Sequence, residues 1–216
     1  MPGPSRNYTK ELERLIQKLQ QEGKVPRLLL HACCAPCSSA VLEYLSQYFA
    51  ITLLYYNPNI APLEEYQKRE AELRRLVSQM KFIHPVELLP CQYDGQAFVQ
   101  AARGLEGEPE GGKRCEACFR LRLRYAAQEA ARLRFDYYTT TLSISPMKNA
   151  PLLNQLGEEI GREFGVAHLP SDFKKKDGYK RSVQLSKEYD LYRQDYCGCA
   201  FSKAQRQREK EEREEV

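Results

Sequence analysis

Short apolar runs alternate with longer stretches of helical periodicity along most of the chain, and this alternation constrains the fold more than any other feature. Five runs have the length and residue types of buried strands, at residues 27–31, 51–56, 86–89, 137–141 and 166–169. Helical patterns lie between and after them, at residues 39–47, 63–80, 96–102, 119–133, 151–164 and 181–189. Strands that alternate with helices are typical of parallel sheets. We therefore predict an α/β fold with an open, mostly parallel five-stranded sheet that helices flank.

The length of 216 residues suits one domain with short appendages at both ends. Apolar residues at helical spacing, followed by Gly23, predict a leading helix within residues 1–24. Residues 25–202 form the predicted catalytic core. Residues 203–216 are almost entirely polar and charged, and we expect them to form a solvated helix or a disordered extension.

Composition indicates the compartment but not the partner. No apolar run approaches the length of a membrane span, and the first residues lack the apolar segment of a secretory signal. We therefore expect a cytoplasmic protein without membrane contact, in a compartment where thiols stay reduced. The net charge of +4 identifies no partner by itself.

Seven of the eight cysteines fall into three tight clusters. We predict that these seven are metal ligands: Cys33, Cys34, Cys37, Cys115, Cys118, Cys197 and Cys199. Clustered thiols in a reducing compartment are more typical of metal sites than of disulfides. Cys91 stands apart from the clusters, and we expect it to be a small buried apolar residue.

The first cysteine cluster directly follows the first predicted strand, and polar or charged residues follow the other four. Open α/β sheets bind their ligands at the carboxyl ends of the strands. We therefore expect the metal site, and with it an active site, at this edge of the sheet.

Seven thiols suit two metal centres better than one. A structural zinc ion and a 4Fe–4S cluster each take four thiolates, which leaves three unused. Neighbouring side chains of an extended chain point to opposite sides, so Cys33 and Cys34 are expected to face different centres. Four ligands for a cluster and three for an iron ion is the simplest division, but the residues alone do not assign each cysteine.

A basic segment follows the fifth predicted strand. It contains Lys174, Lys175, Lys176, Lys180 and Arg181, with Tyr179 among them. Basic side chains neutralise phosphates, and an aromatic ring can stack on an unpaired base. We predict that this segment binds nucleic acid; the alternative is that each residue is ordinary solvated surface. Arg120, Arg122 and Arg124 alternate with leucines, so only some of these arginines can reach such a ligand.

Seven longer motifs, most of them near predicted strand ends, carry a family resemblance. They occupy residues 30–37 (LHACCAPC), 55–60 (YYNPNI), 114–119 (RCEACF), 140–146 (TTLSISP), 172–176 (DFKKK), 178–182 (GYKRS) and 192–199 (YRQDYCGC). Together they resemble the QueH family, the cobalamin-independent epoxyqueuosine reductases, from about residue 28 to residue 202. The leading helix and the charged tail lie outside this resemblance.

The resemblance implies an oxidoreductase that reduces epoxyqueuosine to queuosine at the wobble position of tRNA, the final step of queuosine biosynthesis. It implies a 4Fe–4S cluster beside a second, mononuclear iron, in agreement with the ligand count. The tRNAs for Tyr, His, Asp and Asn would be substrates, and a ferredoxin or flavodoxin would supply electrons. Some relatives have an aspartate where this chain has Cys37, so its second metal is expected to have a more thiolate-rich ligand set.

Conversion of an epoxide to an alkene and water needs two electrons and two protons, and three residues are candidate proton donors. Asp172 follows the fifth predicted strand, where burial would raise its pKa, although an aspartate there is equally typical of a helix cap. Asp195 and Tyr196, beside the last cysteine pair, are the alternatives. Asn57 and Asn59 are predicted to bind the substrate, although Asn-Pro-Asn is equally typical of a turn.

Two other functions remain open at this point. One is a zinc-stabilised tRNA-binding module without catalysis. The other is a tRNA sulfur-transfer enzyme, because the predicted scaffold is Rossmann-like and similar to that of ATP pyrophosphatases. A sulfur-transfer enzyme of that kind normally has a loop rich in glycine and serine after its first strand, where this chain has Cys33–Cys37.

Overall fold

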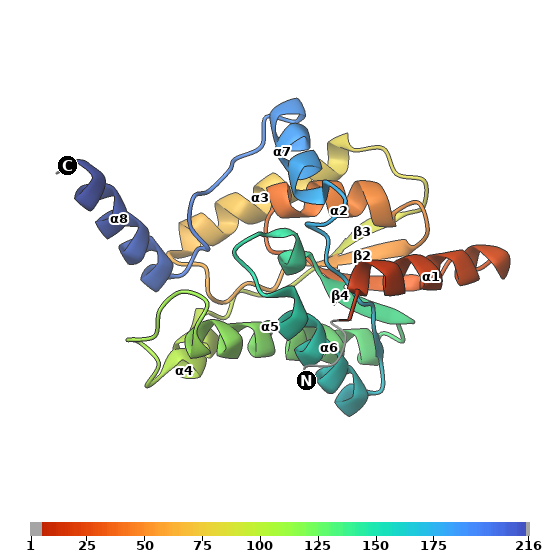
Figure 1. Ribbon diagram of the computed structural model, residues 1–216, viewed down its shortest axis with the longest axis horizontal. Helices are drawn as coiled ribbons and strands as arrows, with labels where there is room; N and C mark the ends of the chain where they lie inside the picture. Colours follow the sequence, from red (N-terminus) through yellow and green to blue (C-terminus); the bar gives the residue numbers. More distant parts are fainter. Residues whose placement is uncertain (1–5, 215–216) are drawn as a thin grey trace.

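The computed structural model describes residues 6–214, in which strands and helices alternate (Figure 1). The strands are β1 (Arg27–His31), β2 (Ala50–Leu54), β3 (Val86–Leu89), β4 (Tyr137–Thr140) and β5 (Ala167–His168). The helices are α1 (Tyr8–Gln21), α2 (Ala35–Leu45), α3 (Leu63–Gln79), α4 (Gly95–Ala102), α5 (Lys113–Arg132), α6 (Ala150–Phe164), α7 (Gly178–Glu188) and α8 (Ala200–Glu214), with a 3-10 turn η1 (Thr141–Ile144).

The five strands form one sheet in the order β3-β2-β1-β4-β5, and every neighbouring pair is parallel. The α/β fold and the five-stranded parallel sheet predicted from the sequence are therefore confirmed. The chain runs outward from β1 to β3, and then returns to the other side of β1 to build β4 and β5. The direction of winding thus reverses between β1 and β4, which is where open α/β sheets bind ligands.

Helices cover both faces of the sheet. Successive side chains of a strand point to opposite sides, so an apolar strand such as β1 presents apolar side chains to both faces. Leu28 and Leu30 of β1 pack into one core with α1, α2, α3 and α7, and Leu29 packs into a second core with α5 and α6. Figure 1 shows these two groups of helices on opposite sides of the strands. All three leucines are fully buried, as a central parallel strand requires.

Three helices begin at least three residues earlier than their hydrophobic patterns predict. α2 begins at Ala35 and not at residue 39, α5 begins at Lys113 and not at residue 119, and α7 begins at Gly178 and not at residue 181. Pro36 suits the first turn of α2, since proline has no N–H to leave unpaired and its φ is already helical. Because α2 and α5 begin early, three of the clustered cysteines, Cys37, Cys115 and Cys118, lie on helices. Three strands, β2, β4 and β5, are shorter than predicted.

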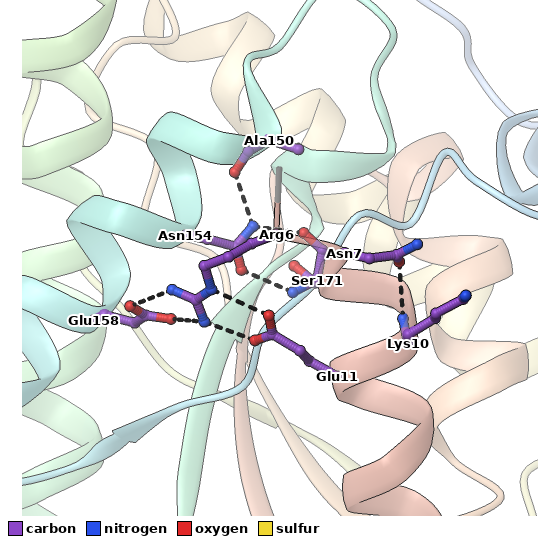
Figure 2. A network of polar contacts seen from close by, with 8 residues as sticks. All are labelled: Arg6, Asn7, Lys10, Glu11, Ala150, Asn154, Glu158 and Ser171. Carbon is purple, nitrogen blue, oxygen red and sulfur yellow. Dashed lines mark hydrogen bonds and ion pairs between the residues drawn. The ribbon is translucent and has the colours of Figure 1, made fainter. Parts of the chain in front are cut away.

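The leading helix is observed as α1 and packs on the sheet through three buried residues, Leu12, Ile16 and Leu19. Arg6, just before it, donates to the carboxylates of Glu11 and Glu158 at 2.6–3.1 Å and so links α1 to α6 (Figure 2). These charges are partly exposed, so the pairs contribute only about 0–1 kcal/mol each. Residues 1–5 of the predicted leading segment lie outside the described residues.

The charged tail is a helix, α8, which projects away from the body of the protein (Figure 1). It begins directly after the last cysteine pair and continues to Glu214; residues 215–216 lie outside the described part of the chain. Within residues 6–214, none of the helices is both long enough and apolar enough to cross a bilayer.

Candidate metal centre

Cys33, Cys34 and Cys37 come together at the carboxyl end of β1. Their Sγ atoms lie within 4.8 Å of one another, and those of Cys33 and Cys34 are 3.9 Å apart. The expectation that adjacent cysteines must face different centres does not hold here. The chain does not stay extended but turns from β1 into α2, with Cys34 as the N-cap of the helix. These three thiols are therefore placed to bind a metal together.

The ends of β2 and β4 fix the loop that carries this group. The Asn57 Nδ2 donates to the Ala32 carbonyl at 2.9 Å, and the Cys33 N–H donates to the Thr141 Oγ1 at 3.1 Å. The Thr141 hydroxyl in turn donates to the Cys33 Sγ at 3.2 Å. Hydrogen bonds from the neighbouring thiols, chiefly that of Cys34, hold the pKa of Cys33 well below its ordinary value. A stable thiolate, the form that binds metals, is therefore available in this group.

The other four clustered cysteines line a single cavity. Cys115 and Cys118 lie in the first two turns of α5, and Cys197 and Cys199 lie just before α8. The cavity is lined further by residues from α4, α5, α8 and the loops before α3, α5 and α6, namely Asn59, Phe98, Glu110, Arg114, Phe119, Lys148 and Ser202. The chain thus brings together four thiols from two segments about eighty residues apart in the sequence.

Gly198 allows the last cysteine pair to approach α3. Its φ of +117° is one that other residues rarely adopt, and a Cβ there would lie 2.9 Å from the Arg69 Nη1 and from the Ile60 Cγ1. The Arg69 Nη1 donates to the Cys197 carbonyl at 3.2 Å, and the Ala61 N–H donates to the Gly198 carbonyl at 3.0 Å. The pair is therefore held by its backbone, which leaves both thiols free for a ligand.

Backbone N–H groups donate to two of the four sulfur atoms. The Gly111 N–H lies 3.2 Å from the Cys115 Sγ, and the Ser202 N–H lies 3.3 Å from the Cys199 Sγ. Such donors stabilise thiolates. Burial, in contrast, raises the pKa of Cys118 to about 12 and also raises the pKa of Cys197. A metal must therefore displace protons from at least these two thiols when it binds.

The donor set fits an iron–sulfur site. All eight cysteines are free. Cys33, Cys34 and Cys37 form a group with no histidine or carboxylate in it, and the other four thiols line a cavity that also contains Glu110. Soft thiolate ligands of this kind suit zinc, copper(I) or iron–sulfur clusters. Cys91 lies apart and packs at the edge of the second core, with its thiol 3.7 Å from the Tyr125 hydroxyl.

Among the buried cations beside the thiols that the sequence did not identify are Arg122 and Lys148. The Lys148 side chain is 7% exposed, lines the four-thiol cavity and pairs with Glu110 at 3.1 Å. Arg122 is 2% exposed and follows Cys118 by one helical turn. Position 122 belongs to the apolar stripe of α5 with Phe119 and Leu123, so the helical pattern itself could have indicated that this arginine is buried. 

The neighbouring arginines of α5 face outward instead. Arg120 pairs with Glu159 at 2.8 Å, and Arg124 pairs with Glu163 at 2.5 Å. These two arginines therefore link α5 to α6 at the surface, and Arg122 alone of the three points into the protein.

The two predicted substrate-binding asparagines have different surroundings. Asn57 is fully buried and uses its amide inside the protein, where Nδ2 donates to Ala32 and Oδ1 accepts from Arg122. Asn59 is 2% exposed and lines the four-thiol cavity, and its Oδ1 is buried without a hydrogen-bond partner in residues 6–214. Of the two, Asn59 has the free polar atom that a ligand in this cavity would meet.

The predicted nucleic-acid segment extends from the end of β5 into α7. Its ion pairs are Lys174 with Asp172, Lys176 with Glu13, and Arg181 with both Glu43 and Glu188. Lys175, Tyr179 and Lys180 are exposed, and the two lysines form no ion pair within residues 6–214. The Lys174 Nζ also donates to the Lys148 carbonyl at 3.5 Å, which connects the segment to the wall of the four-thiol cavity.

The three candidate proton donors lie in three environments. Asp172 lines a different cavity, of about 370 Å³, between α1, α2 and α7. Asp195 is 47% exposed, and a hydrogen bond from Lys210 of α8 lowers its pKa. Tyr196 is half-buried beside the Arg69 guanidinium, 5.0 Å from the ring centre, and burial raises its pKa. Of the three candidates, Tyr196 is the one directly adjacent in sequence to a cysteine of the four-thiol cavity, Cys197.

Comparison with known proteins identifies the relatives of this chain. A family model described as "Epoxyqueuosine reductase QueH" matches residues 28–205. Two curated proteins of that name are 42% identical to the chain. The one from Streptococcus pyogenes serotype M1 aligns over 93% of this chain and 80% of its own length, and the one from Staphylococcus epidermidis over 91% and 84%. The Thermotoga maritima protein of the same name is 34% identical, over 83% of this chain and 91% of its own length.

Proposed function

Because the chain belongs to the epoxyqueuosine reductase QueH family, we propose that it removes the epoxide oxygen of epoxyqueuosine in tRNA and forms queuosine and water. The chain is an oxidoreductase of queuosine biosynthesis. We propose further that the substrate nucleoside stands at the wobble position of the tRNAs for Tyr, His, Asp and Asn.

One observation carries this proposal: seven free thiols form two groups at the carboxyl edge of the sheet, three after β1 and four in one cavity. Seven thiolates suffice for a 4Fe–4S cluster with four ligands and a mononuclear iron with three. When bound, the cluster and the iron would supply single electrons and a Lewis acid for the epoxide oxygen. Because the electrons come from outside, a small redox protein such as a ferredoxin or flavodoxin is the expected donor.

The residues around the thiols would position the substrate and supply protons. Asn59 offers an unpaired amide oxygen, which can accept a hydrogen bond from a substrate hydroxyl. The lowered pKa of Asp195 keeps that carboxylate ionised at neutral pH, so it is a poor proton donor. Tyr196, next to Cys197, and Asp172 remain the candidates for that role.

The exposed residues of the basic segment would bind the anticodon loop. Lys175 and Lys180 are unpaired cations in the described residues, and the Tyr179 side chain is 40% exposed. A wobble base lies in an unpaired loop, so little energy is needed to turn it toward the thiols, and an exposed aromatic ring can stack on a neighbouring base.

The test is anaerobic reconstitution followed by metal and sulfide analysis. The loaded protein is then incubated with epoxyqueuosine-containing tRNA and dithionite, and the nucleosides are identified by mass spectrometry. We expect queuosine with the iron-loaded protein and with Cys91→Ser, but not with Cys199→Ser, which removes a predicted ligand. Stoichiometric zinc without labile sulfide would refute the proposal in favour of a zinc-stabilised tRNA-binding module.

A further inference from the structure

Arg122 is a buried cation without a carboxylate partner. Its side chain is almost fully enclosed, 2% exposed, and no ion pair with an aspartate or glutamate exists for it within residues 6–214. Its Nη2 donates to the Asn57 Oδ1, and its Nε lies 3.3 Å from the His31 Nε2. Its Nη1 has no hydrogen-bond partner in the described residues. A buried charge without a partner is costly, so a counter-charge is expected close by.

Arg122 lies one turn of α5 after Cys118 and contacts His31, two residues before Cys33, so both cysteine groups can supply its counter-charge once their thiols bind a metal as thiolates. Burial lowers the pKa of Arg122, but negative charge at Cys118, Cys197 and Cys33 outweighs burial and raises it. Cys118 and Cys197 belong to the four-thiol cavity, whereas Cys33 belongs to the group after β1. Arg122 is thus placed to act on the electrostatic potential of the whole metal centre.

We propose that Arg122 is the buried counter-charge of the metal centre and raises its reduction potential. A thiolate-bound cluster becomes one charge more negative when it accepts an electron, and a fixed cation beside it favours this reduced form. The unpaired Nη1 N–H supplies a donor for a sulfur atom, which acts in the same direction. In this proposal Arg122 acts on the charge of the centre and not on the substrate, so it is a positioning residue that tunes the centre. This inference rests on the proposed iron–sulfur function.

A purely structural role would have different consequences. Arg122 also connects Asn57, after β2, with His31, at the end of β1, and its loss would loosen this contact. A loosened contact would lower stability or metal content but would leave the potential of the loaded protein unchanged. Charge is therefore the property to vary, and Arg122→Lys keeps the charge while it removes the planar fork.

The test compares iron-loaded wild type with Arg122→Met, Arg122→Lys and Arg120→Met. Arg120 is a matched control, because it lies on the same helix but pairs with Glu159 at the surface. Iron and sulfide are measured first, and the potential is then determined by redox titration with electron paramagnetic resonance. We expect Arg122→Met to lower the equilibrium constant for reduction at least tenfold, about 59 mV for one electron. Arg122→Lys should shift it less, and Arg120→Met should leave it unchanged.

The possible failures can be told apart. A fully loaded Arg122→Met protein with the wild-type potential would overturn the inference and leave the proposed function intact. If Arg122→Met does not take up iron, Arg122→Gln decides, because it also removes the charge but keeps an N–H donor: a wild-type potential would overturn the inference, and a tenfold lower equilibrium constant for reduction would support it. Wild-type protein that binds zinc without sulfide would refute the proposed function and this inference together.

Discussion

Replacement of Asn154 should weaken the attachment of the basic segment to the sheet. Asn154 is fully buried in α6, and its amide contacts the main chain just after β5 (Figure 2). The Oδ1 accepts from the Ser171 N–H at 2.8 Å, and the Nδ2 donates to the Ser171 carbonyl at 2.7 Å. The Nδ2 also donates to the Ala150 carbonyl at 2.8 Å. The Asn154 side chain thus pairs both main-chain polar groups of Ser171, the residue that leads into the basic segment.

The cost of Asn154→Ala can be worked out from these contacts. Ser171 is 2% exposed, so its N–H and its carbonyl would both be left buried and unpaired. Each such loss costs about 1–3 kcal/mol. The Ala150 carbonyl keeps its bond within α6 and adds little. We therefore expect the free energy of unfolding to fall by about 2–6 kcal/mol, a large share of the 5–15 kcal/mol that is typical of a whole domain.

Asn154→Asp should make the free energy of unfolding depend on pH through this contact. An ionised carboxylate could still accept from Ser171 but would place negative charge against two carbonyl oxygens, where the amide now donates. The folded state therefore raises the pKa of the new carboxyl above its unfolded value. Between these two pKa values the folded chain binds more protons, so the stability lost at neutral pH should partly return as the pH falls.

Anaerobic urea denaturation of the loaded protein measures both effects, and hydrogen exchange of residues 170–176 reports the local one. Asn149→Ala is the matched control: this exposed asparagine caps the same helix, with its Oδ1 accepting from the Leu152 N–H at 3.0 Å. Loss of a cap costs about 1 kcal/mol and should not affect residues 170–176. If Asn154→Ala costs no more than Asn149→Ala and leaves exchange in that segment unchanged, the Asn154 amide does not hold residues 170–176 to the sheet.

Three further outcomes are expected. Lys175→Ala should reduce the slope of log tRNA affinity against log salt concentration by about 0.7–0.9, as measured by filter binding. Lys187→Ala, at the other end of α7, should leave this slope unchanged, and equal slopes for the two variants would exclude a phosphate contact at Lys175. Gly157→Ala should lower the free energy of unfolding by up to about 2 kcal/mol, although alanine has the better helix propensity, because the alanine Cβ would overlap the His168 ring. This loss should vanish in the double variant Gly157→Ala/His168→Ala. Burial lowers the pKa of His168 to about 4, so between that value and the ordinary 6.5 only the unfolded chain is protonated there. As the pH falls through this range, the free energy of unfolding of the wild type should therefore decrease by about 1.4 kcal/mol per pH unit more than that of His168→Gln. Equal pH dependence of the two free energies would contradict this expectation.

Much of the architecture followed from local patterns. Strand β1 is visible in the sequence because a central parallel strand is buried on both faces, which requires an unbroken run such as Leu28–Leu29–Leu30. The edge strand β5 is only two residues long, and its predicted length was too great because hydrophobic pattern does not reveal where pairing stops. The starts of α2 and α5 were missed for a related reason: their first turns carry cysteines for the site and do not follow the apolar period.

Short-range spacing and strand order were enough to predict the fold class, the set of seven clustered thiols and the edge of the sheet at which they gather. The grouping of the thiols could not be predicted in this way, since a turn at Cys34 brings together neighbouring side chains that an extended chain would separate. The same holds for the arginine of α5 that is buried near the thiols. Arg120, Arg122 and Arg124 are alike in sequence, and only the packing of α5 against the sheet buries the middle one without a carboxylate, beside the thiols of both groups.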